Sequence, residues 1–272
     1  MRGGNMNLSE NMKKIILFVF VLALLTLGAC QQAKETLSLS QNGQTAQQMQ
    51  QNSYGENDGR VVVGVTDAAA DMNAVTSIKV VVNNVQLKST TGNWINLKLN
   101  QNTFDLLALK NEEKIALLSD MRIPEGEYDQ MRLEVSQVSV VDNTGEHVAK
   151  LPSNEMKLNG EIIVKNGETA TAVLDVIADE SLHTTGQGDY ILAPVIKLQT
   201  RENAQVDVSS DEIKVNSGQI ITDATVGMDA TGKFEKGLKI NKNDPLSITQ
   251  EGKIKVGVGF ENKKEDGSII VV

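Results

Sequence analysis

Short runs of β-branched and apolar residues, separated by turn-forming residues, constrain the fold of this chain most strongly. Between residues 60 and 200 such runs include Val61–Val65, Ile78–Val82 and Val138–Val141. They recur at intervals of roughly 8–15 residues, and this spacing is typical of antiparallel sandwiches and barrels. No long amphipathic helical pattern accompanies them, which disfavours an α/β fold. The sequence therefore predicts a mainly β fold, an antiparallel β-sandwich with short helices.

Four local patterns predict individual elements. Residues 94–99 alternate apolar and polar side chains, which predicts a half-buried strand. Asn166-Gly167, between two β-rich runs, predicts a β-hairpin. Acidic residues open the segment Asn111–Ser119, which predicts a short helix, and residues 68–75 could add one more helical turn.

The β-rich pattern continues after Arg201 to the end of the sequence. Residues 253–260 alternate strongly, and a turn signal follows them. We expect residues 60–201 to form the β-sandwich domain. Residues 202–272 form either a small separate β module or an extra sheet on that domain, since length alone does not separate the two.

The N-terminus carries an export signal. Two lysines precede an apolar run from Ile15 to Leu27, which is shorter than the ~20 residues that span a bilayer. The sequence Leu27-Gly28-Ala29-Cys30 resembles the lipobox of prokaryotic lipoproteins. By that resemblance, the Cys30 thiol receives a diacylglyceryl group, with acyl chains such as palmitate, and becomes the first mature residue. We predict a lipoprotein signal peptide over residues 1–29, starting at Met1 or Met12.

An ordinary secretory signal with an incidental cysteine is the alternative. It would leave the only cysteine of the chain as a free thiol in an oxidising compartment, which is uncommon. We therefore expect the protein on the extracytoplasmic face of the cell envelope, held to the membrane through the lipid on Cys30. Gln31 follows the cysteine, and by the same resemblance a residue other than Asp there implies transfer to the outer membrane if the cell has one.

Residues 31–59 are rich in glutamine and lack any apolar period. Such a segment cannot bury enough surface to offset its ordering entropy, so we predict that residues 30–59 are a lipidated cysteine followed by a disordered tether. The root-mean-square reach of such a tether is roughly 30 Å. That is enough to hold a folded domain clear of lipid headgroups.

The charge and the rarer residues exclude several classes of function. The formal net charge is −9, which gives no basic footprint for nucleic acid. A single cysteine excludes an internal disulfide and a cysteine-based zinc cage. Most aromatic residues after Cys30 lie in apolar runs and are expected to pack, so nothing favours carbohydrate binding.

Several segments match one family. They are Val65–Ala68 with Asp71, Thr103–Leu107, Pro124–Leu133, Lys157–Gly160 and Tyr190–Ile196. Together they resemble the family catalogued as domain of unknown function 4382, over about residues 60–200. The resemblance implies an exported, often lipid-anchored domain with a β-sandwich of the transthyretin or immunoglobulin kind. The resemblance implies no particular activity.

The segment after Pro124 leaves two interpretations. Pro124 and Gly126 suit a turn, after which Tyr128, Gln130 and Arg132 should share one strand face. Tyr128 then either is buried and anchored by its hydroxyl group, which we favour, or heads a row of ligand-facing side chains.

Candidates for catalysis are few. His147 follows a turn and His183 lies in a polar stretch, and neither belongs to a recognisable catalytic or zinc motif. Residues 227–233 have the spacing of a phosphate-binding loop, but Phe234 stands where Ser or Thr would hold Mg²⁺, so a surface turn is expected. We predict that the protein is not an enzyme.

Metal binding has two candidate groups of carboxylates, with Asp67 and Asp71 the first to test, and no cofactor is predicted. Asp67 and Asp71 could offer carboxylate oxygens to Ca²⁺, as could Asp175, Asp179 and Glu180, but neither spacing fits an EF-hand. We expect an envelope lipoprotein that displays a β-sandwich for binding or adhesion to an envelope or extracellular partner. The alternative is an extracytoplasmic domain that binds a small ligand or Ca²⁺.

Overall fold

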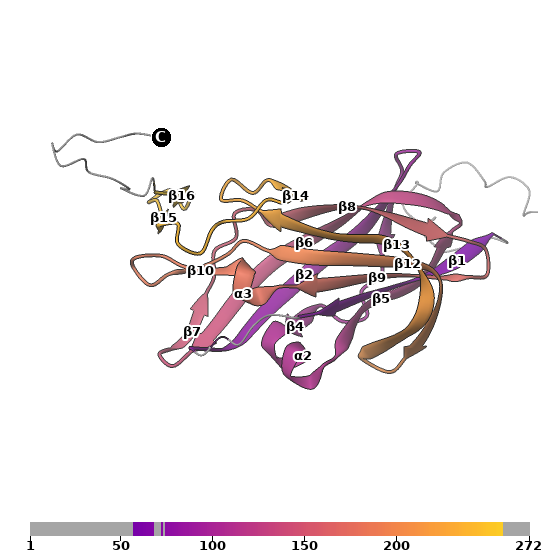
Figure 1. Ribbon diagram of the computed structural model, residues 1–272, viewed down its shortest axis with the longest axis horizontal. Coiled ribbons are helices and arrows are strands. Elements are labelled where there is room, and N and C mark those ends of the chain that lie inside the picture. Colours follow the sequence, from indigo (N-terminus) through magenta and orange to yellow (C-terminus); the bar gives the residue numbers. More distant parts are fainter. Residues whose placement is uncertain (1–56, 68–71, 73, 258–272) are drawn as a thin grey trace, which may run out of the picture. The chain divides into compact units, whose positions relative to one another are not determined.

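Strands dominate the structure, a computed structural model that describes residues 57–67, 72 and 74–257 (Figure 1). The helices in this part of the chain are short: α2 (Leu106–Glu112) and α3 (Ala178–Ser181). Cys30, Asp71, the predicted signal peptide and most of the predicted tether lie outside the described residues. The prediction of a mainly β sandwich with short helices is confirmed.

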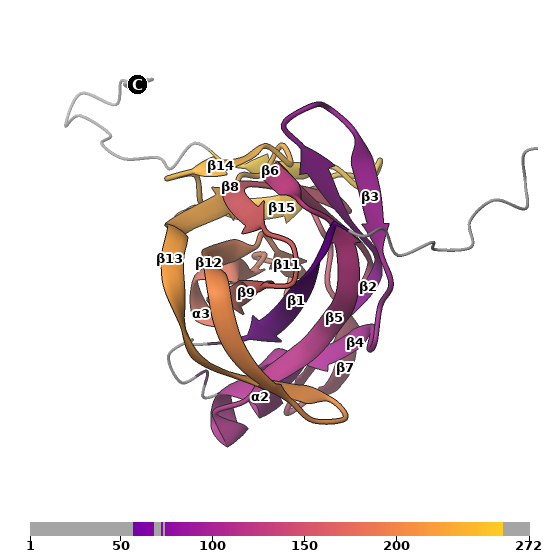
Figure 2. The same cartoon turned by 90° about the vertical axis from the view of Figure 1, so that its right-hand side faces the viewer.

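Two larger sheets make up the sandwich. The first has the order β12-β9-β1-β5-β13-β14. Its strands are β1 (Asp58–Thr66), β5 (Ile115–Pro124), β9 (Thr169–Val176), β12 (Val195–Val208), β13 (Glu212–Met228) and β14 (Phe234–Lys236). Because β12 also pairs with β13, its first five strands close into a ring, which Figure 2 shows end-on.

The second sheet has the order β3-β2-β6-β7, with β4 paired to β2 and β8 paired to β6. Its strands are β2 (Val75–Ser89), β3 (Trp94–Leu97), β4 (Thr103–Asp105), β6 (Gly126–Asp142), β7 (Gly145–Val148) and β8 (Glu155–Val164). Two small sheets pair β10 (Leu182–Thr184) with β11 (Tyr190–Leu192), and β15 (Leu246–Ile248) with β16 (Ile254–Val256).

The valine run of β1 is buried on both of its faces. Val61, Val63 and Val65 point into the main core between the sheets, whereas Val62 packs with Leu117 and Ile213 inside the ring. A strand buried on both faces needs a continuous apolar run rather than an alternating one. The closure of the ring thus explains this stretch of sequence.

The Asn166-Gly167 turn does not form a hairpin, so that prediction is wrong. Gly167 adopts the left-handed conformation the turn needs, with φ 72°, but β8 pairs with β6 and β9 pairs with β1 and β12. The turn therefore carries the chain from one sheet to the other. β1 runs parallel to β9, so the first sheet is not purely antiparallel as predicted.

The helix predicted over Asn111–Ser119 is also misplaced. The side chain of Asp105 caps α2 by accepting from the Ala108 amide, and Glu113, with φ 54°, ends the helix. From Ile115 onward the chain is β5, which pairs with β1.

The C-terminal region continues the first sheet. The expected boundary after residue 201 falls inside β12, and β13 pairs with both β12 and β5. Within the described residues, β15 and β16 pair only with each other, and Leu246 packs beside Ile191 of β11. No helix in the described part of the chain is long and apolar enough to cross a membrane.

Candidate functional site

A β-bulge at Asp129 decides where Tyr128 points. In the pairing of β2 with β6, Lys88 lies opposite Gln130 while Ser89 lies opposite Tyr128, so Asp129 is an extra residue in β6. Tyr128 is buried and its hydroxyl donates to the Pro124 carbonyl at 2.8 Å. The prediction of a buried, anchored tyrosine is confirmed.

The bulge also corrects the predicted strand face. An extra residue reverses the alternation of side chains, so Tyr128 joins the core rather than the face of Gln130 and Arg132. A row of ligand-facing side chains headed by Tyr128 is therefore absent at this strand.

The outer face of the second sheet gathers one aromatic ring and several polar side chains. We use the name outer face for eight side chains of this surface: Trp94 and Asn96 of β3, Gln86 and Lys88 of β2, Gln130 and Arg132 of β6, and Lys157 and Asn159 of β8. The strand register sets two rows, one with Trp94, Lys88, Gln130 and Asn159 and one with Asn96, Gln86, Arg132 and Lys157.

Trp94 is only half-buried on this face. The guanidinium carbon of Arg132 lies 4.0 Å from the centroid of its ring. A cation so close to an aromatic face is attracted by the ring quadrupole. Arg132 also forms an ion pair with Glu155 at 3.5 Å, so both of its partners fix its position. The expectation that the aromatic residues mostly pack inside does not describe Trp94.

Two amide pairs cross the strands of the outer face. The Gln86 amide nitrogen donates to Asn96 Oδ1 at 2.6 Å, and that of Gln130 donates to Asn159 Oδ1 at 2.6 Å. Asn96 and Asn159 are exposed and act as acceptors in these pairs. Their own amide hydrogens have no other partner within the described part of the chain, so they are available as donors.

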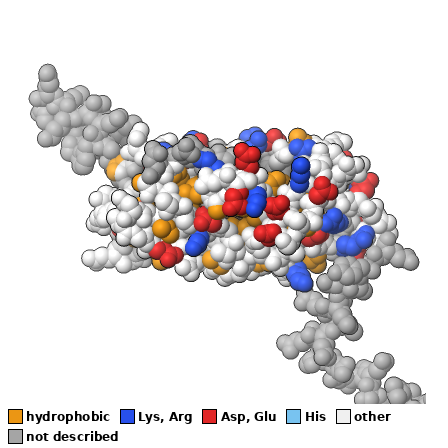
Figure 3. All heavy atoms as spheres, turned by 90° about the horizontal axis from the view of Figure 1, so that it is seen from below, with side chains coloured by type: hydrophobic (Ala, Val, Ile, Leu, Met, Phe, Trp, Pro, Cys, Tyr) orange, Lys and Arg blue, Asp and Glu red, His pale blue; other side chains and the backbone are white. Residues whose placement is uncertain are grey.

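Each basic side chain of the outer face has a carboxylate neighbour, and Arg132 and Lys157 share Glu155. Lys157 contacts Glu155 at 2.9 Å, and Lys88 lies 3.9 Å from Asp129. Basic and acidic side chains are likewise interspersed on the face of the molecule drawn in Figure 3. The outer face therefore carries no strong patch of either sign.

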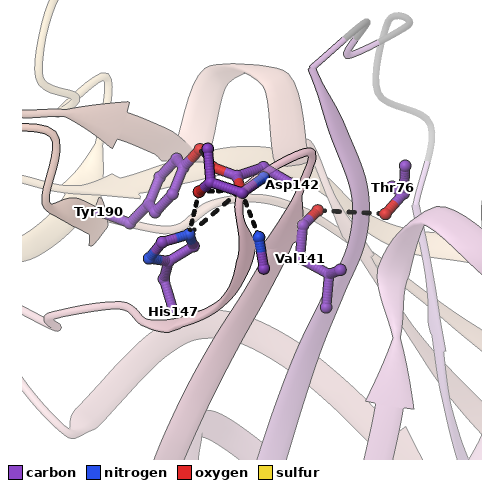
Figure 4. A network of polar contacts seen from close by, with 7 residues as sticks. Thr76, Val141, Asp142, His147 and Tyr190 are labelled. Atoms are coloured by element: carbon purple, nitrogen blue, oxygen red, sulfur yellow. Dashed lines mark hydrogen bonds and ion pairs between the residues drawn. The ribbon is translucent and has the colours of Figure 1, made fainter.

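A second polar cluster surrounds Asp142 at the β6–β7 turn (Figure 4). Its Oδ1 accepts from the Thr144 amide and hydroxyl, both at 2.7 Å, and lies 3.1 Å from His147 Nε2. Its Oδ2 accepts from the Tyr190 hydroxyl at 2.8 Å. The hydrogen bonds from Thr144, and then that from Tyr190, hold the pKa of Asp142 well below its usual range.

The Asp142 cluster does not have the geometry of a catalytic relay. Thr144 Oγ1 lies 2.8 Å from His147 Nε2, but its one hydrogen is directed to Asp142. His147 is then the donor in that contact, whereas a general base must accept the proton of the nucleophile. Both contacts also use the same imidazole nitrogen. The cluster instead joins the β6–β7 turn to β11.

His183 lies in β10 and not in a polar loop. Its side chain is buried, and its Nε2 has no hydrogen-bond partner among the described residues. Burial, and then the charge of Lys242, lower the pKa of His183. Burial therefore favours the neutral imidazole, and the side chain is not exposed at the surface.

One family matches the chain from β1 to the residues just before β12. The family described as Domain of unknown function (DUF4382) matches residues 58–194, which is just over half of the chain. The chain belongs to the DUF4382 family. No curated protein and no solved structure matches it. Membership confirms the resemblance drawn from the sequence, and it attaches no activity to the DUF4382 domain.

Asp67 lies at the end of β1 in this DUF4382 domain and has a structural partner. It is buried, and its Oδ1 accepts from the Ala178 amide at the start of α3, at 3.1 Å. Asp71, the other predicted ligand, lies outside the described residues. Within them, no three His, Cys, Asp or Glu side chains converge on a metal position.

The second predicted set of Ca²⁺ ligands comprises Asp175, Asp179 and Glu180, and these do not converge on a metal position among the described residues either. Asp179 lies 3.9 Å from Lys242, and Glu180 contacts Lys239 at 3.3 Å. The carboxylates of Asp179 and Glu180 therefore each face an ammonium group. This arrangement favours ion pairs over a shared cation.

An apolar cavity of about 40 Å³ lies in the main core of the DUF4382 domain. Its lining includes Val80, Val82, Phe104, Leu133, Val176 and Ile196. A pocket that recognises a ligand needs some polar groups to orient it, and this lining has none. We regard the cavity as a packing defect.

The outer face is the functional candidate that the sequence analysis missed. Part of its signal was present, because the alternation that turns Ile95 and Leu97 inward also turns Trp94 and Asn96 outward. The remaining side chains come from β2, β6 and β8, and only the strand register brings them beside β3.

Proposed function

We propose that this protein is a non-catalytic envelope lipoprotein that displays its DUF4382 sandwich for binding or adhesion. Cys30 carries the lipid, the following residues give the domain reach, and the sandwich presents a surface to a partner. In an envelope with two membranes, Gln31 directs the protein to the outer one.

One observation carries this proposal: the only cysteine of the chain lies where lipoprotein processing requires it. It follows Leu27-Gly28-Ala29 and ends an apolar run too short to span a bilayer. Stable anchoring needs two or more acyl chains, and a diacylglyceryl group supplies two. From Cys30 to the start of β1 at Asp58 there is chain enough for a reach of roughly 30 Å.

The contacts of the histidines support a non-catalytic role. His147 donates within the Asp142 cluster, and His183 is buried in β10. Neither meets the geometry of a general base beside a nucleophile. A display function instead needs a stable scaffold with an exposed surface, and the sandwich provides both.

Crosslinking on intact cells, followed by membrane fractionation, tests the proposal. The wild-type protein should sediment with membranes and crosslink to an envelope or extracellular partner. Cys30→Ala should release the protein and abolish the crosslink, and Gln31→Ala should leave anchoring unchanged as a neighbouring control. A Cys30→Ala variant that still sediments and crosslinks would contradict the proposal.

Binding of Ca²⁺ through Asp67 and Asp71 is the alternative function. It predicts that added Ca²⁺ raises the melting temperature of the purified protein, and that Asp71→Asn removes the increase. An unchanged melting temperature in a Ca²⁺ titration excludes it.

A further inference from the structure

The outer face of the second sheet combines features that suit a sugar chain. It has a half-buried tryptophan, paired amides and basic side chains that each contact a carboxylate, all on neighbouring strands. We infer that the outer face binds an extended, neutral glycan. The inference deepens the proposed display function, since it names the class of partner that the sandwich would hold.

Trp94 provides the apolar contact. Sugar rings present C–H groups on their faces, and these pack on the face or edge of an aromatic ring, which buries a large area with few rotatable bonds. Arg132 covers one face of the indole, with its guanidinium carbon 4.0 Å from the ring centroid, so it holds the ring in place and a sugar would pack on the edge or the opposite face. A ring fixed in advance loses less conformational entropy when a ligand binds.

The amides provide polar contacts beside the ring. A primary amide donates and accepts within one plane, so it can bond to a pair of neighbouring hydroxyl groups. Asn96 and Asn159 are exposed, and they are held in place by Gln86 and Gln130 respectively. The face thus offers oriented donors on β3 and on β8, at opposite sides of the two central strands.

The pairing of each basic side chain with a carboxylate disfavours ionic partners. Arg132 and Lys157 both contact Glu155, and Lys88 faces Asp129. A nucleic acid or an acidic polysaccharide would need unpaired basic groups, and a basic partner would need unpaired carboxylates. A neutral ligand with many hydroxyl groups needs neither unpaired basic groups nor unpaired carboxylates.

The width of the face favours an extended ligand over a single sugar. The four strands from β3 to β8 lie side by side, and neighbouring strands are about 4.8 Å apart. The two asparagines also lie in different rows, two residues apart along the strands, so they are separated by roughly 16 Å. No single monosaccharide reaches across that distance. A chain of several sugars can contact Trp94 and both asparagines together.

Fluorescence of Trp94 reports directly on the site, because it is the only tryptophan in the chain. The full chain, purified in detergent, is titrated with cellohexaose, xylohexaose and maltohexaose, and with a galacturonic acid hexamer as the anionic counterpart. We expect a saturable change in emission with at least one neutral oligosaccharide and none with the anionic one. A flat emission with all three neutral ligands, or a response to the anionic one alone, overturns the inference.

Variants then locate the site by calorimetry. Trp94→Ala should weaken binding by about tenfold or more, and Asn96→Ala or Asn159→Ala by about three- to tenfold each. Gln219→Ala, an exposed amide on β13, is the matched control and should bind like the wild type. Equal affinity of wild type, Trp94→Ala and Asn96→Ala overturns the inference, and Asn96→Ala keeps the test valid if Trp94→Ala misfolds.

Self-association is the competing use of the outer face. If sedimentation velocity shows a dimer and Trp94→Ala dissociates it, the outer face binds a second copy of the chain. That result would overturn the inference of glycan binding. The binding test is independent of the anchor, because Cys30→Ala should bind the same oligosaccharide as the wild type. Failure of anchoring and failure of glycan binding are therefore distinguishable.

Discussion

Replacing Tyr128 with phenylalanine removes one buried hydroxyl group and leaves the ring in place. The ring lies in the main core with 2% of its surface exposed, and the hydroxyl donates to the Pro124 carbonyl at 2.8 Å. A hydrogen bond of this kind contributes roughly 0.5–1.5 kcal/mol to stability. Pro124 itself is exposed, so water can replace the lost donor and no buried acceptor is left unsatisfied.

We therefore expect Tyr128→Phe to lower the free energy of unfolding by about 1 kcal/mol at pH 7. For a folded unit of about 200 residues this corresponds to a fall of about 2–4 °C in the melting temperature. The effect is small because the aromatic packing is unchanged.

The same hydroxyl makes stability depend on alkaline pH. Burial, and then the charge of Asp58, raise the pKa of Tyr128 from 10.0 to about 12. Since the folded-state pKa lies above the unfolded one, the stabilisation is complete below about pH 10 and is lost as the pH rises towards 12. By pH 11 the wild type should have lost roughly 1–2 kcal/mol that the variant cannot lose, so the two stabilities should converge.

Guanidinium chloride unfolding followed by circular dichroism at pH 7, 9 and 11 measures both effects. Tyr190→Phe serves as a control, because it removes a different hydroxyl and should keep the alkaline dependence that Tyr128 causes. If Tyr128→Phe and the wild type have the same free energy of unfolding at pH 7 and the same change in it up to pH 11, the hydroxyl is not anchored as described.

Three further changes test other parts of the structure, each by equilibrium unfolding. Gly227→Ala would place a methyl group against the Leu238 carbonyl, so we expect the free energy of unfolding to fall by at least about 2 kcal/mol. Gly186→Ala is the control: its methyl group would meet no neighbour within 4 Å, so it should be nearly neutral. Leu158→Ala empties a fully buried position and should cost about 2–5 kcal/mol; a loss below about 1 kcal/mol would contradict the described core. Asp142 has a folded-state pKa below the unfolded one, so its stabilisation is present above about pH 4 and lost as the pH falls further. Asp142→Asn should flatten this acid dependence, and an unchanged profile would count against the cluster.

Local sequence patterns predicted the elements that depend on local rules. In β3, the alternation of apolar and polar residues correctly placed Ile95 and Leu97 towards the core. His147 was expected to follow a turn, and the chain does turn between β6 and β7 just before it. Turn chemistry and side-chain alternation are properties of a few consecutive residues, which is why they can be recognised in one sequence.

Elements that depend on distant partners could not be predicted in this way. β5 is buried on both faces, so its run Ala116-Leu117-Leu118 does not alternate and resembles a helix face. The bulge at Asp129 follows from the register of β6 against β2, which no local pattern contains. Asn166-Gly167 gave a true turn, but β1 takes the place beside β9 that a hairpin partner would occupy.

The candidate site shows the same division. The outward position of Trp94 follows from the alternation in β3, and this much was available from the sequence. Its proximity to Arg132 requires β2 to lie between β3 and β6, a matter of sheet order. Single residues can be assigned to a face from sequence, whereas a surface built by four strands needs their order and register.

Mass spectrometry of the N-terminal peptide, from protein purified out of native membranes, tests the lipid anchor most directly. The proposed function predicts a peptide that begins at Cys30 and carries a diacylglyceryl group on its sulfur. A Cys30 with an unmodified thiol, whether the leader is intact or cut at another residue, would contradict it.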